Sequence, residues 1–473
     1  MSIESQQNLQ KSLMTVADRR AWLQQSACGF GFLSFAGLAA LEAQAARPTN
    51  THHRPTAKRV IFLFLHGGVS HMDSFDPKPQ LDRYDGQPLP IAKPKVTFAK
   101  TGNVLKSPWK FKRYGQSGLP VSSLFPNIGA HVDDLCIIRS MKSDFVSHGG
   151  ATLQLHTGDG NLTRPSLGSW LMYGLGSENS NLPGFVNLCP TYYHGGAQNY
   201  GSAFLPGQFQ GLRIGDGNTK FTKARLENLL ESAAELQQQR RQLNLLQKWN
   251  QRHADKANDS RLNARMAAFE LAFRMQRYAP QAMDISDESQ ETLRLYGIGS
   301  GPTDEYGREC LLARRLAERG VRFIQVSHSY PVNYWDQHGG LRAGHQANAK
   351  KVDQPIAGLL TDLKRRGMLD DTLVVFGTEF GRSPTVQGRD GRDHNPTGFT
   401  MWFAGGGVKG GMSYGATDDF GLHSVKDIVT INDFHAIILH LMGIDHTRLV
   451  YRHAGRDFRL TDVGGRVPSE ILA

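Results

Sequence analysis

Residues 60–79 read VIFLFLHGGVSHMDSFDPKP, a continuous apolar run that ends abruptly in His66 and a glycine pair. An apolar run without polar alternation is typical of a parallel strand buried on both faces. Two later segments repeat the pattern, 323–341 (FIQVSHSYPVNYWDQHGGL) and 372–384 (TLVVFGTEFGRSP). Because ligands bind where the carboxyl ends of parallel strands meet, polar residues at three such ends predict one shared site.

Strand and helix patterns alternate along most of the chain. Strands are expected at 60–65, 135–138, 185–188, 321–326 and 372–376, and helices at 310–319, 352–366 and 433–442. This alternation predicts an α/β fold, with a mostly parallel sheet and helices on both faces. Asp433 is the expected N-cap of the last helix.

The stretch from about 219 to 284 differs in composition from the rest. Leu, Ala, Gln, Glu, Lys and Arg recur there at helical spacing, which predicts a pair of long helices with a break near 257–259. We interpret it as a helical insertion in the fold. It would either cap the site or pack on the core.

The N-terminus has the three parts of a twin-arginine export signal. Arg19 and Arg20 precede a mildly apolar run at 26–41, and Ala43-Gln44-Ala45 offers a cleavage site. The chain then divides into a signal peptide at 1–46, a linker at 47–58 and one α/β domain at 59–473. We expect export to the periplasm or cell envelope; the alternative is an amphipathic N-terminal helix.

Charge and composition limit the class of partner. The formal net charge of +11 favours an anionic small molecule or glycan as substrate. No recognition helix or aromatic-studded basic motif predicts nucleic-acid binding. No apolar run after residue 50 is long enough for a transmembrane helix. Cys136, Cys189 and Cys310 lack disulfide or metal spacing and are expected to be buried apolar residues. The oligomeric state stays open.

Side chains that bind metals gather at the strand ends. Those residues are His66, His71, Asp73, Asp76, Asp336, His338, His345, Glu379, Asp393 and His394. Imidazole nitrogen mixed with carboxylate oxygen suits zinc, manganese or iron, whereas calcium prefers oxygen alone. We predict one or two divalent ions, zinc or manganese, that clamp an anionic ester and generate a hydroxide nucleophile.

Three arginines accompany these segments. Arg382, Arg389 and Arg392 are candidates for binding the anionic group of a substrate bidentately. The alternative is that two of the three are solvated loop residues. Asp393 and His394 are expected in a loop without a core nearby. The sequence contains no P-loop or H-E-x-x-H motif, so the hydrolase chemistries that depend on them fit less well.

From about Lys58 to its end, the chain resembles the exported proteins grouped as domain of unknown function 1501. These are sulfatase-like proteins of the alkaline-phosphatase-like superfamily. The resemblance is carried by 62–79, 165–179 (PSLGSWLMYGLGSEN), 269–276 (FELAFRMQ), 335–341, 372–384, 391–411 (GRDHNPTGFTMWFAGGGVKGG) and 454–463 (AGRDFRLTDV). It implies an alkaline-phosphatase/sulfatase-like core and hydrolysis of sulfate or phosphate esters.

The resemblance also implies roles for single residues. In the superfamily a metal-binding Asp closes the first strand, and His66 stands there. Asp336 and His338 match an Asp and a His that bind one metal. Glu379 keeps the carboxylate of a T-x-D-H motif, and His394 suits a late metal-binding His.

The nucleophile position is the main departure from the superfamily. A Ser, Thr or formylglycine there opens a helix that ends in Thr-Gly, and in residues 147–158 (SHGGATLQLHTG) that place falls on His148, with Ser147 beside it. The formylglycine motif C/S-x-P-x-R is absent. We therefore expect His148, Ser147 and Arg382 as catalytic residues, or hydroxide as the nucleophile.

Two functions follow from these residues. The first is a metal-dependent hydrolase of sulfate or phosphate esters in the cell envelope. The alternative is a catalytically inactive envelope protein of the same fold that binds an anionic glycan. The density of potential ligands favours the first, and the irregular nucleophile favours the second, because a fold alone does not establish activity.

Overall fold

A computed structural model describes residues 51–473 apart from 93–99, 192, 225–232, 258–259, 300 and 330–333. The expected signal peptide and residues 47–50 of the expected linker lie outside the described residues, as does part of the expected break at 257–259. Within the described chain, no helix combines the length and apolar character that a membrane crossing requires.

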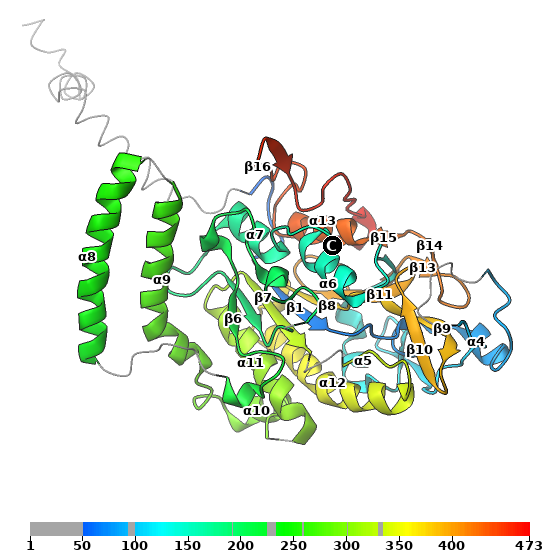
Figure 1. Ribbon diagram of the computed structural model, residues 1–473. Helices are drawn as coiled ribbons and strands as arrows, with labels where there is room; N and C mark the ends of the chain where they lie inside the picture. The colour runs from blue at the N-terminus through cyan, green and yellow to red at the C-terminus, as the bar shows by residue number, and fades with distance from the viewer. Residues whose placement is uncertain are drawn as a thin grey trace, which may run out of the picture. The chain divides into compact units, whose positions relative to one another are not determined.

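A nine-stranded sheet forms the centre of the fold, in the order β12-β4-β11-β8-β1-β7-β5-β6 with β15 beside β4 (Figure 1). Its strands are β1 (Arg59–Leu65), β4 (Leu135–Lys142), β5 (Phe185–Leu188), β6 (Leu212–Ile214), β7 (Phe323–His328), β8 (Thr372–Gly377), β11 (Phe399–Ala404), β12 (Met412–Tyr414) and β15 (Val429–Thr430). All described pairings in this sheet are parallel except those of β11 with β4 and β8. The predicted α/β fold class is confirmed.

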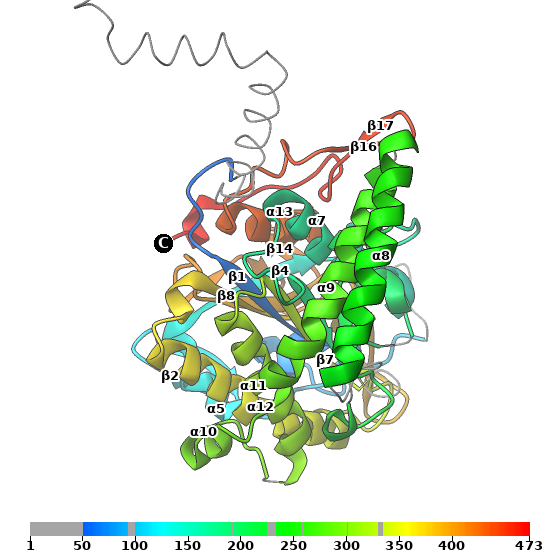
Figure 2. The same ribbon diagram turned by 90° about the vertical axis from the view of Figure 1, so that its left-hand side faces the viewer.

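Helices cover both faces of the sheet (Figures 1 and 2). One face carries α5 (Pro126–Gly129), α11 (Asp304–Glu318) and α12 (Leu341–Arg365), and the other carries α6 (His148–Thr157), α7 (Leu167–Leu175) and α13 (Ile431–Leu441). Alternate residues of β1 serve the two cores: Leu63 belongs to the first and Phe62 to the second. Both side chains are fully buried, as the unbroken apolar run predicts.

Several short elements surround the sheet. They are α4 (Pro79–Arg83), α10 (Gln290–Leu295), and the paired strands β2 (Phe111–Tyr114) with β3 (Leu119–Ser122), β9 (Gly381–Gln387) with β10 (Gly391–Asn395), β13 (Ala416–Thr417) with β14 (Ser424–Lys426), and β16 (Tyr451–His453) with β17 (Arg456–Phe458). The β9–β10 pair matters most for the site, because it carries residues expected in a loop.

The predicted pair of long helices is α8 (Ala233–Ala257) and α9 (Ser260–Met283). They lie side by side (Figures 1 and 2), and Arg240 Nη1 lies 2.7 Å from Glu270 Oε1 between them. α9 also contacts α11 on the core. This contact favours the interpretation of an insertion that packs on the core.

Two helix starts differ from the sequence prediction. α12 begins at Leu341 rather than 352, because its first turns bury polar side chains such as His345 and Asn348, which carry no apolar periodicity. α13 begins one residue after Thr430, which is the N-cap. Asp433 is the third helical residue and completes a capping box with Thr430.

The expected loop around Asp393 and His394 is in fact the strand β10, every residue of which is buried. The alternative of two solvated arginines is also wrong, because Arg382 and Arg392 are fully buried and only Arg389 is exposed. Arg392 Nε lies 2.7 Å from a carboxylate oxygen of Asp73. The β9–β10 pair is therefore part of a buried region, and paired charges lie inside it.

Gly67 allows the close approach of two chain segments beside the strand end of β1. Its φ is +119°, and a Cβ there would lie 2.6 Å from the Trp335 amide nitrogen and 2.8 Å from that of Asp336. Only glycine combines this backbone conformation with this contact.

We therefore expect Gly67→Ala to lower the free energy of unfolding by about 3 kcal/mol or more. Gly86→Ala is the control: its φ is +74° and no atom lies within 4 Å of the added Cβ. It should cost only the backbone strain, about 1–2 kcal/mol. Denaturant unfolding of both variants measures the difference, and equal losses would contradict a role for the close approach.

Candidate metal centre

Five segments bring the predicted metal ligands together at one edge of the sheet. His66 follows β1, and Glu379 lies two residues after β8. Asp336 and His338 lie between β7 and α12, and His394 is in β10. His148 is the first residue of α6 and joins them. The side chains of His66, His148, Glu379 and His394 are buried, whereas Asp336 and His338 are partly exposed.

Glu379 is the centre of the first half of the cluster. Its Oε1 lies 2.6 Å from His148 Nδ1 and 3.9 Å from His66 Nε2. The Gly67 amide donates to both carboxylate oxygens, at 2.9 and 3.1 Å. This backbone donor fixes the orientation of the carboxylate. The glycine at position 67 therefore serves both the fold and the site.

Asp336 is the centre of the second half. Its Oδ1 lies 2.9 Å from His338 Nε2 and 3.2 Å from His394 Nε2. Arg382 Nη2 donates to the same oxygen at 2.7 Å, and Oδ2 lies 3.3 Å from His148 Nε2. One carboxylate thus meets three imidazoles and one guanidinium.

Two groups of three residues have the spacing that a metal ion requires. They are His66, His148 and Glu379, and His148, Asp336 and His394. Within each group the possible ligand atoms lie within 4.8 Å of one another. His148 belongs to both groups, with one ring nitrogen toward each carboxylate. The cluster therefore offers ligands for one ion or for two.

The orientation of the imidazoles fits a metal. His394 Nδ1 donates to the Val146 carbonyl at 2.8 Å, which leaves the lone pair of Nε2 toward Asp336. His148 Nε2 is buried, lies 3.3 Å from Asp336 Oδ2 and makes no hydrogen bond of good geometry within the described residues. A metal ion would satisfy an unpaired buried nitrogen of this kind beside a carboxylate. Mixed nitrogen and oxygen donors suit zinc or manganese.

The charges of the cluster also suit a cation. Burial lowers the pKa of His66 to about 4, so this imidazole is neutral near pH 7, as a ligand must be. Burial opposes ionisation of Glu379 and Asp336, but the surrounding imidazoles outweigh it and hold both pKa values below the usual range. Burial likewise lowers the pKa of His148, yet the two carboxylates raise it above its ordinary value overall.

His194 is a further member of the site that the sequence prediction missed. Its Nδ1 lies 3.1 Å from His66 Nε2, and its ring stacks on His148 with a centroid separation of 5.2 Å. A signal for it was present, because His-Gly-Gly occurs four times in the chain. The four histidines are His66, His148, His194 and His338. All of them meet in this cluster.

Other predicted candidates have structural partners elsewhere. His71 Nε2 lies 2.7 Å from the Gly421 carbonyl, and Asp76 accepts from the Thr417 hydroxyl at 2.6 Å. Asp73 pairs with Arg392, as described above. His345 Nε2 accepts from the Ser70 amide at 3.1 Å. These contacts hold the turn after β1 and do not form part of the cluster.

Two of the predicted catalytic residues have distinct surroundings. Ser147 is the N-cap residue of α6, is exposed, and its side chain does not cap the helix. Arg382 is fully buried. Besides Asp336, its guanidinium donates to the carbonyls of Gly67, Gly68 and Arg392. These four bonds use four of the five N–H donors of Arg382 and tie Asp336 to the main chain.

A family profile described as "Protein of unknown function (DUF1501)" matches residues 57–472. No curated protein matches the sequence significantly.

The chain also matches solved structures over most of its length. They include a lipoteichoic acid synthase from Listeria monocytogenes (9% identity, TM-score 0.38, covering 84% of this chain and 76% of that one). A sulfatase from Pseudoalteromonas sp. is 13% identical (TM-score 0.33, 88% and 71%). The alkaline phosphatase from the Antarctic bacterium TAB5 is 11% identical (TM-score 0.37, 83% and 99%). Identities and TM-scores this low carry no information about activity.

The low pKa of His66 predicts a pH dependence of the metal-free protein. Its pKa is about 4 in the folded chain against 6.5 as the ordinary value. Between these pH values the unfolded chain binds a proton that the folded chain does not, so stability falls as the pH falls. Integrated over this window, His66 accounts for about 3 kcal/mol.

We expect His66→Gln to remove this part of the slope in urea unfolding between pH 7 and 4, measured with a chelator present. Other buried histidines contribute to both proteins, so the difference between the two curves is the readout. Parallel curves for the wild type and the variant would contradict the assignment.

Proposed function

Because this chain belongs to the family described as Protein of unknown function (DUF1501), whose name assigns no activity, we propose its function from the site itself. We propose that it is a metal-dependent hydrolase of sulfate or phosphate esters. The proposal rests on one observation: two groups of potential metal ligands share His148 at the edge of a parallel sheet.

In this proposal, His66, His148 and Glu379 hold one ion, and Asp336 and His394 hold a second or form the alternative site of the first. His338 lies 2.9 Å from Asp336 and completes the second set. Zinc or manganese suits these donors. A bound divalent ion supplies Lewis-acid polarisation of the ester and activation of water.

The chain's own residues orient the ligands. The Gly67 amide holds Glu379, the Arg382 guanidinium holds Asp336, and the Val146 carbonyl fixes the tautomer of His394. Ligand partners of this kind raise metal affinity by about 10–100-fold in other proteins. Arg382 is therefore a positioning residue in this proposal.

We assign the attack to water rather than to a side chain. His148 lies between two carboxylates, with Nδ1 2.6 Å from Glu379 and Nε2 3.3 Å from Asp336, and serves as a metal ligand in this proposal. Ser147 is exposed on the adjacent helix end and does not cap the helix. A serine nucleophile needs an adjacent base or a lowered pKa to react.

Charge supports an anionic substrate. The net charge of +11 favours sulfated or phosphorylated small molecules and acidic glycans. The twin-arginine pattern at the N-terminus supports export, so we propose that the substrate is met in the periplasm or cell envelope. Metal loading before export is compatible with that route.

Ser147 also favours the alternative function, because it is exposed and its side chain makes no hydrogen bond that caps the helix. A protein of this fold without an activated hydroxyl nucleophile could bind an anionic glycan and not cleave it. The two proposals differ in turnover, and both allow metal binding. Measured hydrolysis therefore separates them.

The first test is the metal content of the purified mature protein by mass spectrometry. We expect one or two equivalents of zinc or manganese, and a loss of at least one equivalent in His394→Ala and Glu379→Gln. His453→Ala is the control, because His453 is exposed in β16, outside the cluster. A well-folded, metal-free protein with unchanged variants would refute the hydrolase proposal.

The second test is turnover of sulfate and phosphate monoesters by the metal-loaded protein. We expect Ser147→Ala to retain kcat within about twofold, because water attacks, whereas Asp336→Asn should lower it by about 100-fold or more. A loss of all turnover in Ser147→Ala would replace water by a covalent serine route. Metal binding without turnover on any ester would favour the glycan-binding protein.

A further inference from the structure

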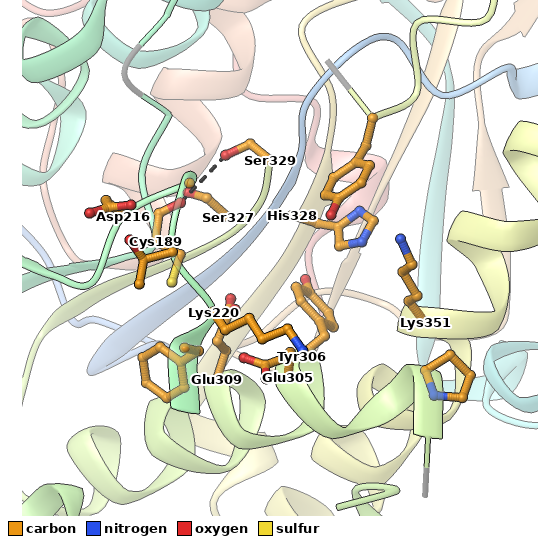
Figure 3. A pocket seen from close by; sticks show the side chains of 15 residues that line it. Cys189, Asp216, Lys220, Glu305, Tyr306, Glu309, Ser327, His328, Ser329 and Lys351 are labelled. Carbon is orange, nitrogen blue, oxygen red and sulfur yellow. Dashed lines mark hydrogen bonds between the residues drawn. The ribbon is translucent and has the colours of Figure 1, made fainter. Parts of the chain in front are cut away.

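A cavity of about 230 Å³ opens at the carboxyl ends of β5 and β7. It lies between these strands and the helices α11 and α12 (Figure 3). His328, the last residue of β7, lines it. Alternation along β7 places His328 on the same face as Ile324 and Val326, whose side chains belong to the core under α11 and α12. His66 follows β1 in the alternation of Phe62 and Phe64, whose side chains belong to the core on the opposite face of the sheet. The cavity is therefore separate from the metal cluster.

Two unsatisfied polar groups of α11 face this cavity. Tyr306 and Glu309 lie one turn apart and are 3% and 7% exposed. The Tyr306 hydroxyl and Glu309 Oε2 are buried and have no hydrogen-bond partner among the described residues. A buried polar atom without a partner costs about 1–3 kcal/mol. Both groups therefore point to a ligand that the chain does not supply.

His328 adds a third donor. The Trp335 indole donates to His328 Nδ1 at 3.1 Å, and an indole N–H cannot accept. Burial lowers the pKa of His328 to about 3, so the ring is neutral and carries its proton on Nε2. That N–H is left for the cavity.

Lys351 adds a positive charge. Its Nζ lies 4.4 Å from the centroid of the Tyr334 ring, on the wall of the cavity. Within the described chain it forms no ion pair, and burial lowers its pKa. The carboxylates nearby are already used: Glu305 accepts from the Thr222 amide and hydroxyl at 3.1 and 2.9 Å. A partly buried cation without a carboxylate partner favours an anionic ligand.

Glu309 acts as a donor rather than as a second anion. Burial raises its pKa well above the ordinary value, and its other contact is with the Cys189 thiol. A neutral carboxyl group donates through its O–H. The Glu309 carboxyl, Tyr306 hydroxyl and His328 Nε2–H can thus all donate to one acceptor group beside the Lys351 ammonium.

We propose that this cavity binds a small organic monocarboxylate. Its carboxylate would accept from Tyr306, Glu309 and His328 beside the Lys351 ammonium. Its apolar or aromatic body would lie against the rings of Phe221 and Tyr334, which line the cavity with Pro302. Asp216, Glu305 and Lys220 also line the cavity, so that with Lys351 the charges of its wall cancel and favour a monoanion over dianions such as phosphate or sulfate.

Isothermal titration of the full-length mature protein with benzoate and phenylacetate tests the proposal. Benzamide and phenyl phosphate are the matched probes for charge. We expect both carboxylates to bind at least about 10-fold more tightly than either probe, which corresponds to about 1.4 kcal/mol. Equal binding of benzamide, or no binding of either carboxylate up to millimolar concentration, would overturn the proposal.

Variants locate the site. Lys351→Met and Tyr306→Phe should each weaken carboxylate binding by about 10-fold or more, because each removes one group that meets the ligand. Lys350→Met is the control, since Lys350 is the exposed neighbour. Glu309→Gln keeps an N–H donor and should keep binding. Unchanged affinity in Lys351→Met and Tyr306→Phe, with thermal unfolding as in the wild type, would overturn the proposal.

The metal cluster must be excluded as the place of binding. His394→Ala should bind benzoate as the wild type does if the cavity is the site. Loss of binding in His394→Ala with retention in Lys351→Met would assign the carboxylate to the metal cluster and overturn the proposal. This outcome is independent of whether the protein hydrolyses esters, because only binding is measured.

Discussion

The rest of the site depends on the contacts of the Asp336 carboxylate. It meets His338, His394 and Arg382 through one oxygen and His148 through the other. These partners come from α6, the β9–β10 pair and the turn before α12. Because Arg382 is fully buried, removal of this carboxylate would leave a buried charge without its counter-charge, which is among the costliest changes in a protein. Asp336 therefore joins the stability of the fold to the geometry of the cluster.

Much of this arrangement could be predicted from the sequence, because buried parallel strands have a distinctive composition. The run before His66 and the run before Glu379 are fully buried strands, and their ends meet as the topology requires. The resemblance to a known family added His148, which no local pattern placed beside Glu379. Strand composition thus located the edge of the sheet, and the family motif located His148.

The β9–β10 pair could not be predicted in the same way. Its Gly, Arg, Asp, Asn and Pro residues are typical of a solvated loop, yet Arg392 is buried because it pairs with Asp73, 319 residues away in the sequence. A local composition cannot show so distant a partner. The same reason hid the hydrogen bonds that Arg382 donates to Asp336 and to the Arg392 carbonyl.

The four His-Gly-Gly segments have a consequence for the unfolded chain. Glycine has more conformational freedom to lose than any other residue, by about 0.4–1 kcal/mol against alanine where alanine would fit. Gly67 and Gly195 have positive φ and neighbours too close for a side chain, but Gly149 and Gly339 have neither. At these two positions the fold would accept alanine. Glycine there costs conformational entropy on folding, and packing does not explain why it is present. The main chain beside His148 and His338 is therefore left uncovered by any side chain at these two positions.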